Sequence, residues 1–253
     1  MAQTMLWTAF EDAVVLPIRG AAVPWLSALE NRHLARLKVP KRRDDWLLGR
    51  FTVKGLIQKA MEAVLDRTLT PDDFEIAAES SGAPFARLVS GERLPLSISI
   101  SHSHETAFCA VMPLPPPGGT IGADVELLEP RSERFVHDFF TPTEAAAWEE
   151  SLPAERALLA NAIWSAKEAV LKALELGLTV DTRGVEIHLS DEMAGGPLRP
   201  REGAWRRFDA VCAAGIDVDE IPLSGFWSPR GRFVVTLAAR LPETPGKDRH
   251  VSH

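Results

Sequence analysis

A run of prolines and glycines near the middle of the chain restricts the possible folds more than any other feature. Residues 113–119 read PLPPPGG, with four prolines and two glycines in seven positions. Proline fixes φ and lacks a backbone N–H, so neither a helix nor a strand continues through such a run. It predicts a linker between an N-terminal lobe, residues 1–112, and a C-terminal lobe, residues 120–241, followed by a loose tail over 242–253.

Each half shows the same rough order of a strand, then helices, then strands, as judged from apolar residues at helical or alternating spacing. In the first half we expect a strand near 3–10, helices over 24–37 and 44–65, and strands over 73–78, 96–101 and 106–112. In the second half we expect a strand over 120–127, helices over 131–139, 142–151 and 153–176, and strands over 184–190, 205–213, 223–228 and 232–239. This order predicts an α+β fold of two similar lobes, although no residue-level repeat is visible.

Composition excludes several classes of protein. The 253 residues carry a formal net charge of -7, which argues against non-specific binding of nucleic acid. No apolar run approaches the roughly 18 residues needed to span a bilayer, and the N-terminus does not read as a signal peptide. The two cysteines, Cys109 and Cys212, are too few for a cysteine-rich zinc site. They are interpreted as free buried thiols, so we expect a cytoplasmic protein.

Two acidic residues lie two apart in the expected strand TIGADVEL. Asp124 and Glu126 therefore point to the same face, where their like charges repel. One interpretation is a site for a hard cation such as Mg²⁺, which prefers oxygen ligands. The other is a solvated strand face or an ordinary ion pair, and the pair alone favours the latter.

The segment AIWSAKEAVLKALELGL predicts a helix with a polar stripe. Trp164, Glu168 and Lys172 fall at i, i+4 and i+8 and share one side of that helix. If the helix lies against the 120–127 strand, Glu168 becomes a third oxygen donor and Lys172 faces an anionic phosphate. Otherwise Glu168 and Lys172 form a surface salt pair, and Lys167 and Glu175 are likewise solvated charges.

The segment LSISISHSHE alternates apolar residues with serines. Ser101 and His102 are adjacent, so in a regular strand they project to opposite sides. This disfavours a serine–histidine nucleophile pair, and the segment has no Gly-x-Ser-x-Gly elbow. The hydroxyl and imidazole groups are either phosphate ligands or the polar end of a half-exposed strand.

A basic cluster lies in VPKRRDDWLLGRFTVKG. Arg43, Arg50 and Lys54 fall on one side of the expected helix, and further basic residues precede them. In an acidic protein this cluster suggests a site for a small anion. A solvated helix face is an equally good interpretation.

Four segments together resemble the two-lobed 4′-phosphopantetheinyl transferases that activate nonribosomal peptide and polyketide synthases. These segments are SISHS at 99–103, IGADVE at 121–126, FFTPTE at 139–144 and WSAKEAVLK at 164–172, with LLGR at 47–50 as a looser fifth. The resemblance covers about 130 residues and is specific through the combination of IGxDxE and WxxKExxxK. It implies two similar α+β lobes in a pseudo-two-fold arrangement, with the site at their junction.

The resemblance also implies a role for each matching residue. Asp124, Glu126 and Glu168 match the family's Mg²⁺ ligands, and Lys172 matches the lysine that contacts the coenzyme A pyrophosphate. The substrate-binding matches are Ser101 and His102 on the nucleotide-binding strand, with Arg43 and Arg50 as candidates for the 3′-phosphate. Glu144 matches an acid whose role is less defined.

Two positions depart from the family pattern. Many relatives have Gly-Lys-Pro where this chain has Gly82-Ala83-Pro84, so a lysine near the nucleotide is missing. Arg87 is one possible substitute. His104 stands where a glycine often follows the SHS segment.

The reaction implied is transfer of phosphopantetheine from coenzyme A to a serine of an apo carrier protein, with release of 3′,5′-ADP. Glu168 or a metal-bound water would take the serine proton, and the enzyme would act as a monomer in the cytoplasm without nucleic acid or membrane. Two rivals stay open. One is a non-enzymatic module that binds a carrier protein or a nucleotide. The other is a different magnesium phosphotransferase or hydrolase, for which no Walker-type loop is present.

Overall fold

The structure is a computed structural model that describes residues 5–12, 23–115, 118–177, 180–193, 199–200, 204–213, 216 and 223–241. The first half contains β1 (Met5–Asp12), α1 (Ala28–Leu34), α2 (Pro40–Leu65), β2 (Phe74–Ala78), β3 (Pro84–Leu88), β4 (Leu96–Ser103) and β5 (Thr106–Pro113). The second half contains β6 (Thr120–Leu127), α3 (Glu133–Phe139), α4 (Pro142–Glu150), α5 (Arg156–Ala173), a 3₁₀ turn (Thr182–Gly184), β7 (Val185–Met193), β8 (Arg199–Pro200), β9 (Arg206–Cys212), β10 (Leu223–Arg230) and β11 (Phe233–Arg240). The expected tail over 242–253 lies outside the described residues.

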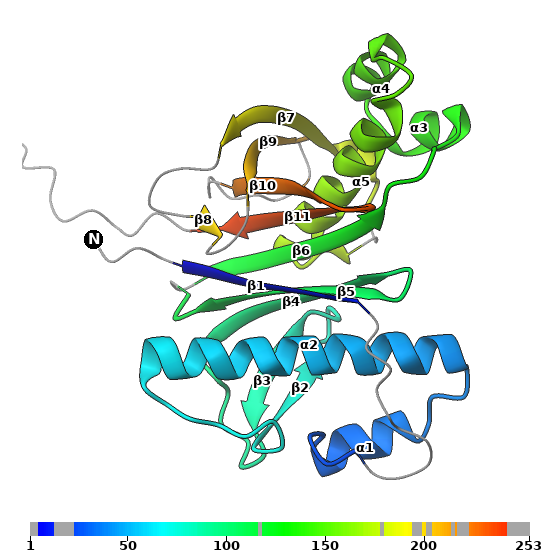
Figure 1. The fold of residues 1–253 in the computed structure, drawn as a ribbon. Helices are drawn as coiled ribbons and strands as arrows, with labels where there is room; N and C mark the ends of the chain where they lie inside the picture. Colours follow the sequence, from blue (N-terminus) through cyan, green and yellow to red (C-terminus); the bar gives the residue numbers. More distant parts are fainter. Residues whose placement is uncertain are drawn as a thin grey trace, which may run out of the picture.

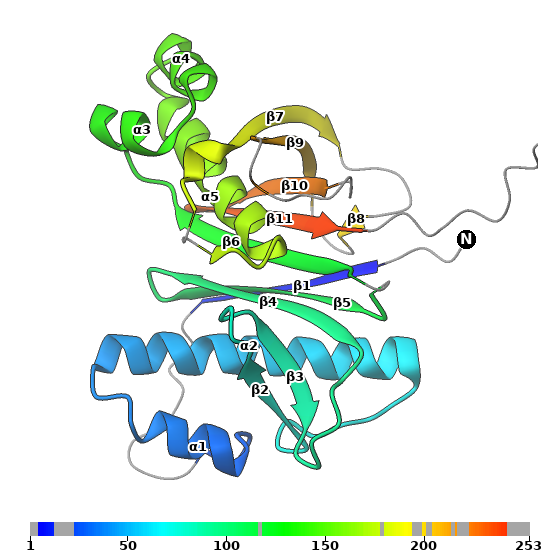
Figure 2. The same cartoon turned by 180° about the vertical axis from the view of Figure 1, so that it is seen from behind.

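The two halves form layers in which two sheets face each other and the long helices α2 and α5 cover the outer faces (Figures 1 and 2). The sheet orders are β4-β5-β1-β8 and β6-β11-β10-β9-β7. The order β1-β5-β4 in the first sheet corresponds to β6-β11-β10 in the second. The prediction of an α+β fold with two similar lobes is therefore confirmed. Some details were wrong: α1 is shorter than expected, α2 begins at Pro40, and the strands β3 and β8 were missed.

One apolar core joins the two sheets. Alternate residues of β5 and β6 point into it, among them Phe108 and Met112 from one sheet and Ile121 and Val125 from the other. The chain passes from the first sheet to the second at the predicted linker, since β5 ends at Pro113 and β6 begins at Thr120. How far the lobes are independent domains stays a prediction.

The helix α5 lies against β6 at a glycine. A Cβ on Gly122 would stand 1.8 Å from the carbonyl oxygen of Ala169 and 2.6 Å from the backbone nitrogen of Ala173. No side chain fits at such distances, so the absence of a Cβ lets helix and strand backbones approach. This contact confirms the expectation that the WSAKEAVLK helix packs on the IGADVE strand.

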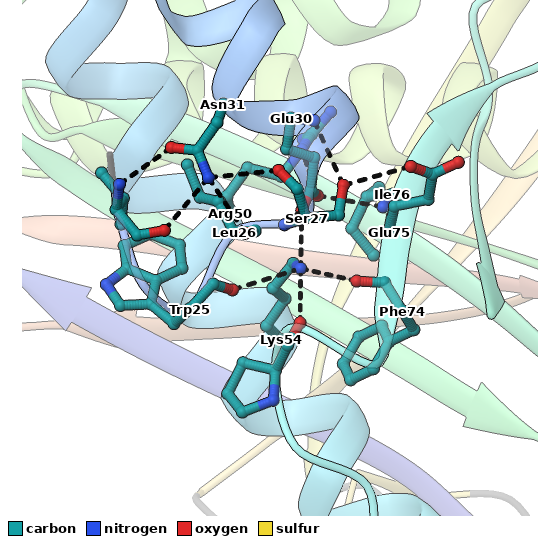
Figure 3. Close-up of polar contacts among 12 residues, drawn as sticks. Trp25, Leu26, Ser27, Glu30, Asn31, Arg50, Lys54, Phe74, Glu75 and Ile76 are labelled. Carbon is teal, nitrogen blue, oxygen red and sulfur yellow. Dashed lines mark hydrogen bonds and ion pairs between the residues drawn. The ribbon is translucent and has the colours of Figure 1, made fainter. Parts of the chain in front are cut away.

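A buried lysine anchors the first half (Figure 3). Lys54 of α2 is 1% exposed, and its Nζ lies 2.6 Å from Glu30 Oε2. The same ammonium donates to the carbonyl oxygens of Pro71 at 2.6 Å and Phe74 at 2.7 Å. Glu30 in turn accepts a hydrogen bond from the backbone nitrogen of Ile76 at 3.0 Å. One ion pair thus ties α1, α2 and β2 together.

The second half repeats this arrangement. Lys167 of α5 is fully buried, and its Nζ lies 2.7 Å from Glu144 Oε2. The ammonium donates to the carbonyl oxygens of Thr182 and Val185. Glu144 accepts from the backbone nitrogen of Ile187 at 2.7 Å. The less defined acid of FFTPTE is therefore a structural anchor that ties α4, α5 and β7 together.

The helix caps extend the repeat. Ser27 and Thr141 each begin a capping box with the buried glutamate three residues later. Their hydroxyls donate to Glu75 Oε2 at 3.1 Å and to Glu186 Oε2 at 2.8 Å. A residue-level repeat therefore exists in buried polar groups, although the sequence did not reveal it.

The repeat corrects two expectations. Lys54 was expected in an anion site or on a solvated helix face, and Lys167 as a solvated charge; both are buried and ion-paired. Burial lowers the pKa of each ammonium, which makes its carboxylate partner essential for holding the charge.

We predict that Gly122→Ala strongly destabilises the protein, because the added methyl group meets backbone atoms that cannot move aside. The expected loss is about 3 kcal/mol or more in the free energy of unfolding, measured by urea denaturation. Gly55→Ala in the interior of α2 is the control, since its Cβ meets nothing within 4 Å. That control should stabilise by roughly 0.5–1 kcal/mol, and equal effects of the two changes would contradict the packing described.

We predict that Lys54→Met and Lys167→Met each cost about 3–5 kcal/mol, because each leaves a buried carboxylate without its partner. Lys41→Met is the control, since the Lys41 side chain is 78% exposed and pairs with Asp45 on the surface. Its cost should stay under about 1 kcal/mol in the same urea titration. Similar losses for all three variants would show that the buried pairs do not anchor the halves.

Candidate active site at the seam between the sheets

The seam between the sheets is formed by their edge strands, β4 and β6. Serine side chains of β4 reach the backbone of β6: Ser97 Oγ accepts from the nitrogen of Ile121 at 3.0 Å, and Ser99 Oγ accepts from the nitrogen of Ala123 at 2.9 Å. Hydroxyl groups thus take the place of a neighbouring strand and satisfy N–H groups on the open edge of β6.

The third serine of this row leads to the buried carboxylate. Ser101 Oγ donates to Asp124 Oδ1 at 2.7 Å, and Lys172 Nζ lies 2.6 Å from the same oxygen. Lys172 also donates to the carbonyl oxygen of Ala123 at 3.1 Å. Asp124 is 2% exposed, and its Oδ2 is buried with no hydrogen-bond partner in the part of the chain that the structure describes. One oxygen of this carboxylate is therefore saturated and the other is open.

Glu126 and Glu168 border Asp124 on the face of β6 that α5 covers. Glu126 Oε1 accepts from Trp164 Nε1 at 3.2 Å, and Glu126 Oε2 lies 2.8 Å from Arg131 Nη2. Glu168 Oε2 lies 3.6 Å from Lys172 Nζ, one helical turn along α5. The Trp164–Glu168–Lys172 stripe therefore faces the carboxylates, as its spacing predicted.

Crowding of these acids shifts their pKa values. Burial, followed by the charge of Asp124, raises the pKa of both Glu126 and Glu168 to about 7. Burial lowers the pKa of Lys172, but the carboxylates of Asp124 and Glu168 outweigh it, so that pKa lies above its usual value. The site gathers three acids, Asp124, Glu126 and Glu168, against two cations, Lys172 and Arg131.

The predicted metal ligands come together, but they do not form a ready-made metal cage. Within the described ranges, no group of three His, Cys, Asp or Glu side chains is close enough to hold an ion. Two of the three carboxylates have a basic partner, Lys172 for Asp124 and Arg131 for Glu126. Metal binding by Asp124, Glu126 and Glu168 stays a prediction.

The prediction that Ser101 and His102 project to opposite sides is correct in geometry. Ser101 is buried at the seam, whereas His102 is exposed on the other side of β4. His102 lines a hollow of about 530 Å³ together with Lys41, Arg42 and Arg50 of α2. Arg43, predicted as a partner of Arg50, is not among the lining residues. The residues of α2 that line the hollow include Lys41, Arg42 and Trp46.

A second hollow of about 530 Å³ opens along the serine face of β4. Its lining includes Lys172, Glu175, Arg93 and the Gly82-Ala83-Pro84 segment. Arg87 does not line this hollow, and its guanidinium pairs with Glu75 Oε1 at 2.6 Å. Arg93 lines the hollow and pairs with Glu79 Oε1 at 2.5 Å. Ile100 lines both hollows, so they adjoin across β4.

Sequence patterns missed Arg131 and Arg93. Neither belongs to a motif or a periodic face, and only the folded chain brings them to the site. The two cysteines are free, with Cys109 buried and Cys212 half-buried. No helix in the described part of the chain is long and apolar enough to cross a membrane.

Comparisons with known proteins point to one family. A model of the 4′-phosphopantetheinyl transferase superfamily matches residues 120–212. The chain is similar to a 4′-phosphopantetheinyl transferase of Bacillus subtilis, with 26% identity over 181 residues that cover 67% of this chain and 74% of that protein. It is also similar to a holo-[acyl-carrier-protein] synthase of Shouchella clausii, with 33% identity over 87 residues, 34% of this chain and 73% of that protein.

Two solved structures are similar at lower levels. The holo-[acyl-carrier-protein] synthase of Thermotoga maritima shares 20% identity at a TM-score of 0.37, over 49% of this chain and 63% of that one. The Helicobacter pylori holo-[acyl-carrier-protein] synthase in complex with coenzyme A shares 17% identity at a TM-score of 0.36, over 47% of this chain and 97% of that one. TM-scores this low do not establish a shared fold, so the sequence matches are the stronger finding.

We predict a pH dependence of stability from the two shifted carboxyl groups. Their folded pKa of about 7 exceeds the usual 4.5, so the folded state holds more protons between these values. Their contribution to the free energy of unfolding therefore falls as pH rises through that window. Relative to wild type, the double variant Glu126→Gln, Glu168→Gln should gain stability from about pH 5 to about pH 8 in metal-free buffer. Parallel stability curves would contradict the shifts.

Proposed function

This chain belongs to the 4′-phosphopantetheinyl transferase superfamily, and on that basis we propose its reaction and the roles of its site residues. The reaction is transfer of the 4′-phosphopantetheine group from coenzyme A to a serine of an apo carrier protein. The products are the holo-carrier protein and 3′,5′-ADP. The observation that carries this proposal is that the matched segment, residues 120–212, contains Asp124, Glu126, Glu168 and Lys172, which converge at one seam.

We propose that Asp124, Glu126 and Glu168 hold Mg²⁺. The donor set suits that ion, which takes oxygen ligands and commonly few carboxylates. The open, buried Oδ2 of Asp124 and the excess of acids over cations in the cluster support this assignment. When bound, the ion neutralises negative charge on the pyrophosphate and on its transition state.

The two adjoining hollows suit the nucleotide of coenzyme A. The hollow along the serine face of β4 would take the nucleoside, since Ser97 and Ser99 line it, and Ser101 follows them on the same face of the strand. The hollow beside α2 would take the 3′-phosphate, because Arg50, His102, Lys41 and Arg42 line it. Arg50 is largely buried and stacks on Trp46 at 4.8 Å, so its guanidinium is held in place. Arg43 is at most an outer contributor to this site.

The chain's own residues would position and deprotonate the reactants. Lys172, held at the seam by Asp124 and the Ala123 carbonyl, adds positive charge to the oxygens of the pyrophosphate. The carrier serine attacks the phosphorus bonded to pantetheine, and the bond to the bridging oxygen of 3′,5′-ADP breaks. Glu168, which lies one helical turn from Lys172 at the seam, would accept the serine proton.

A single chain suffices for this reaction, because both walls of the seam come from the same chain. We therefore propose a monomer that acts on coenzyme A and a carrier protein. The free thiols of Cys109 and Cys212 are in keeping with a cytoplasmic location.

We predict that Asp124→Asn, Glu168→Gln and Lys172→Met each lower turnover by at least about 100-fold while the fold survives. The assay is the mass gain of an apo carrier protein incubated with coenzyme A and Mg²⁺. Glu149→Gln is the matched control, since Glu149 is an exposed acid of α4. Wild-type turnover by Asp124→Asn would remove that residue from the site.

The rival proposal is a module that binds a carrier protein or a nucleotide without chemistry. The basic hollow beside α2 would serve that role equally well. Only an enzyme adds the mass of phosphopantetheine to a carrier protein. If none of a panel of apo carriers gains mass on incubation with this protein, coenzyme A and Mg²⁺, the rival is favoured. Release of 3′,5′-ADP without any carrier would instead indicate a hydrolase.

A further inference from the structure

Arg131 follows β6 and is held on every side. Its Nη2 lies 2.8 Å from Glu126 Oε2, its Nε donates to Asn161 Oδ1 at 2.7 Å, and its Nη1 lies 3.0 Å from Glu129 Oε1. The guanidinium carbon also stacks over the ring of Phe135, 4.8 Å from the ring centre. Two hydrogen bonds, an ion pair with Glu129 and one stacked face leave this side chain little freedom.

A fully buried residue backs this arrangement. Asn161 of α5 is 0% exposed, and its Nδ2 donates to the carbonyl oxygens of Glu129 and Ala157, both at 2.7 Å. Its Oδ1 is thereby aimed at Arg131. The position of the guanidinium is thus set by α5, the helix that also carries Glu168 and Lys172.

The three carboxylates differ in how firmly they are held. Both oxygens of Glu126 have a donor, one from Arg131 and one from Trp164. Among the described residues, Asp124 Oδ2 has no hydrogen-bond partner, and the ion pair found for Glu168 is with Lys172, at 3.6 Å. Because each carboxylate oxygen has two lone pairs, the donors on Glu126 orient it and leave room for a cation.

We propose that Arg131 is a positioning residue, which fixes the orientation in which the Glu126 carboxylate receives the divalent cation. The inference rests on the proposed metal site and adds a residue to it. Arginine suits the role because its planar fork serves Glu126, Asn161 and Glu129 at once, which a lysine ammonium does not reproduce. Partners behind a ligand typically change metal affinity by roughly 10- to 100-fold when they are removed.

A purely structural role is the competing explanation. Arg131 joins β6 to α3 through Phe135, so its loss would loosen that connection whatever binds at Glu126. The two explanations differ in what they predict for metal affinity. A structural role changes the free energy of unfolding alone, whereas a positioning role also weakens the binding of the cation.

The test measures binding of Mn²⁺ to the full chain in the presence of coenzyme A. The electron paramagnetic resonance signal of free Mn²⁺ reports how much of the ion is unbound, and Mg²⁺ is added as a competitor for the same site. Arg131→Met should weaken Mn²⁺ binding roughly 10- to 100-fold, and Arg131→Lys should recover part of the loss. Arg134→Met is the control, since the Arg134 side chain is 90% exposed and pairs with Asp138 on the surface of α3. Urea denaturation of each variant, without metal, reports on the fold.

The possible outcomes separate the two proposals. If wild type binds Mn²⁺ and Arg131→Met binds it equally well, the role of Arg131 is overturned while the metal site stands. If Arg131→Met does not fold, Arg131→Lys is the test variant. Wild-type Mn²⁺ affinity in Arg131→Lys would likewise overturn the positioning role of Arg131. If wild type binds no Mn²⁺ or Mg²⁺, the proposed metal site fails and the inference about Arg131 fails with it.

Discussion

The close approach of α5 to β6 at Gly122 determines how the residues of α5 meet the carboxylates of β6. With the backbones of Gly122 and Ala169 in contact, the turns of α5 meet the strand in fixed register. Trp164 reaches Glu126 and Lys172 reaches Asp124 for that reason. A bulkier residue at this point would move the helix away from the carboxylates, so packing and chemistry depend on the same missing side chain.

Much of the site could be predicted from local periodicity. Strand alternation placed Asp124 beside Glu126, and helical spacing placed Glu168 on the same stripe as Lys172. Periodicity describes one element at a time, so it could not show that Lys167 meets a buried carboxylate from another helix. It also could not supply Arg131, because residues between elements have no periodic face.

The two halves use one frame for different purposes. The face of β1 toward α2 carries Trp7 and Ala9, which pack into an apolar core. The corresponding face of β6 carries Asp124 and Glu126. Each half has its own buried lysine–glutamate ion pair, so each half is stabilised separately. The two acids of β6 are joined by Glu168 and Lys172 of α5. The buried Lys167–Glu144 ion pair stabilises the second half. That half can therefore tolerate the mutual repulsion of Asp124 and Glu126 on β6.

The serine row of β4 has a consequence for how the protein could be divided. Side-chain hydroxyls of β4 cover the edge of β6 only while the two halves are in contact. A fragment cut at residues 113–119 would carry a bare strand edge and half of a shared apolar core into water. Such edges recruit any strand they meet. The separated halves are therefore expected to fold only when they reassociate. Fragment complementation would describe this protein better than independent folding of each half.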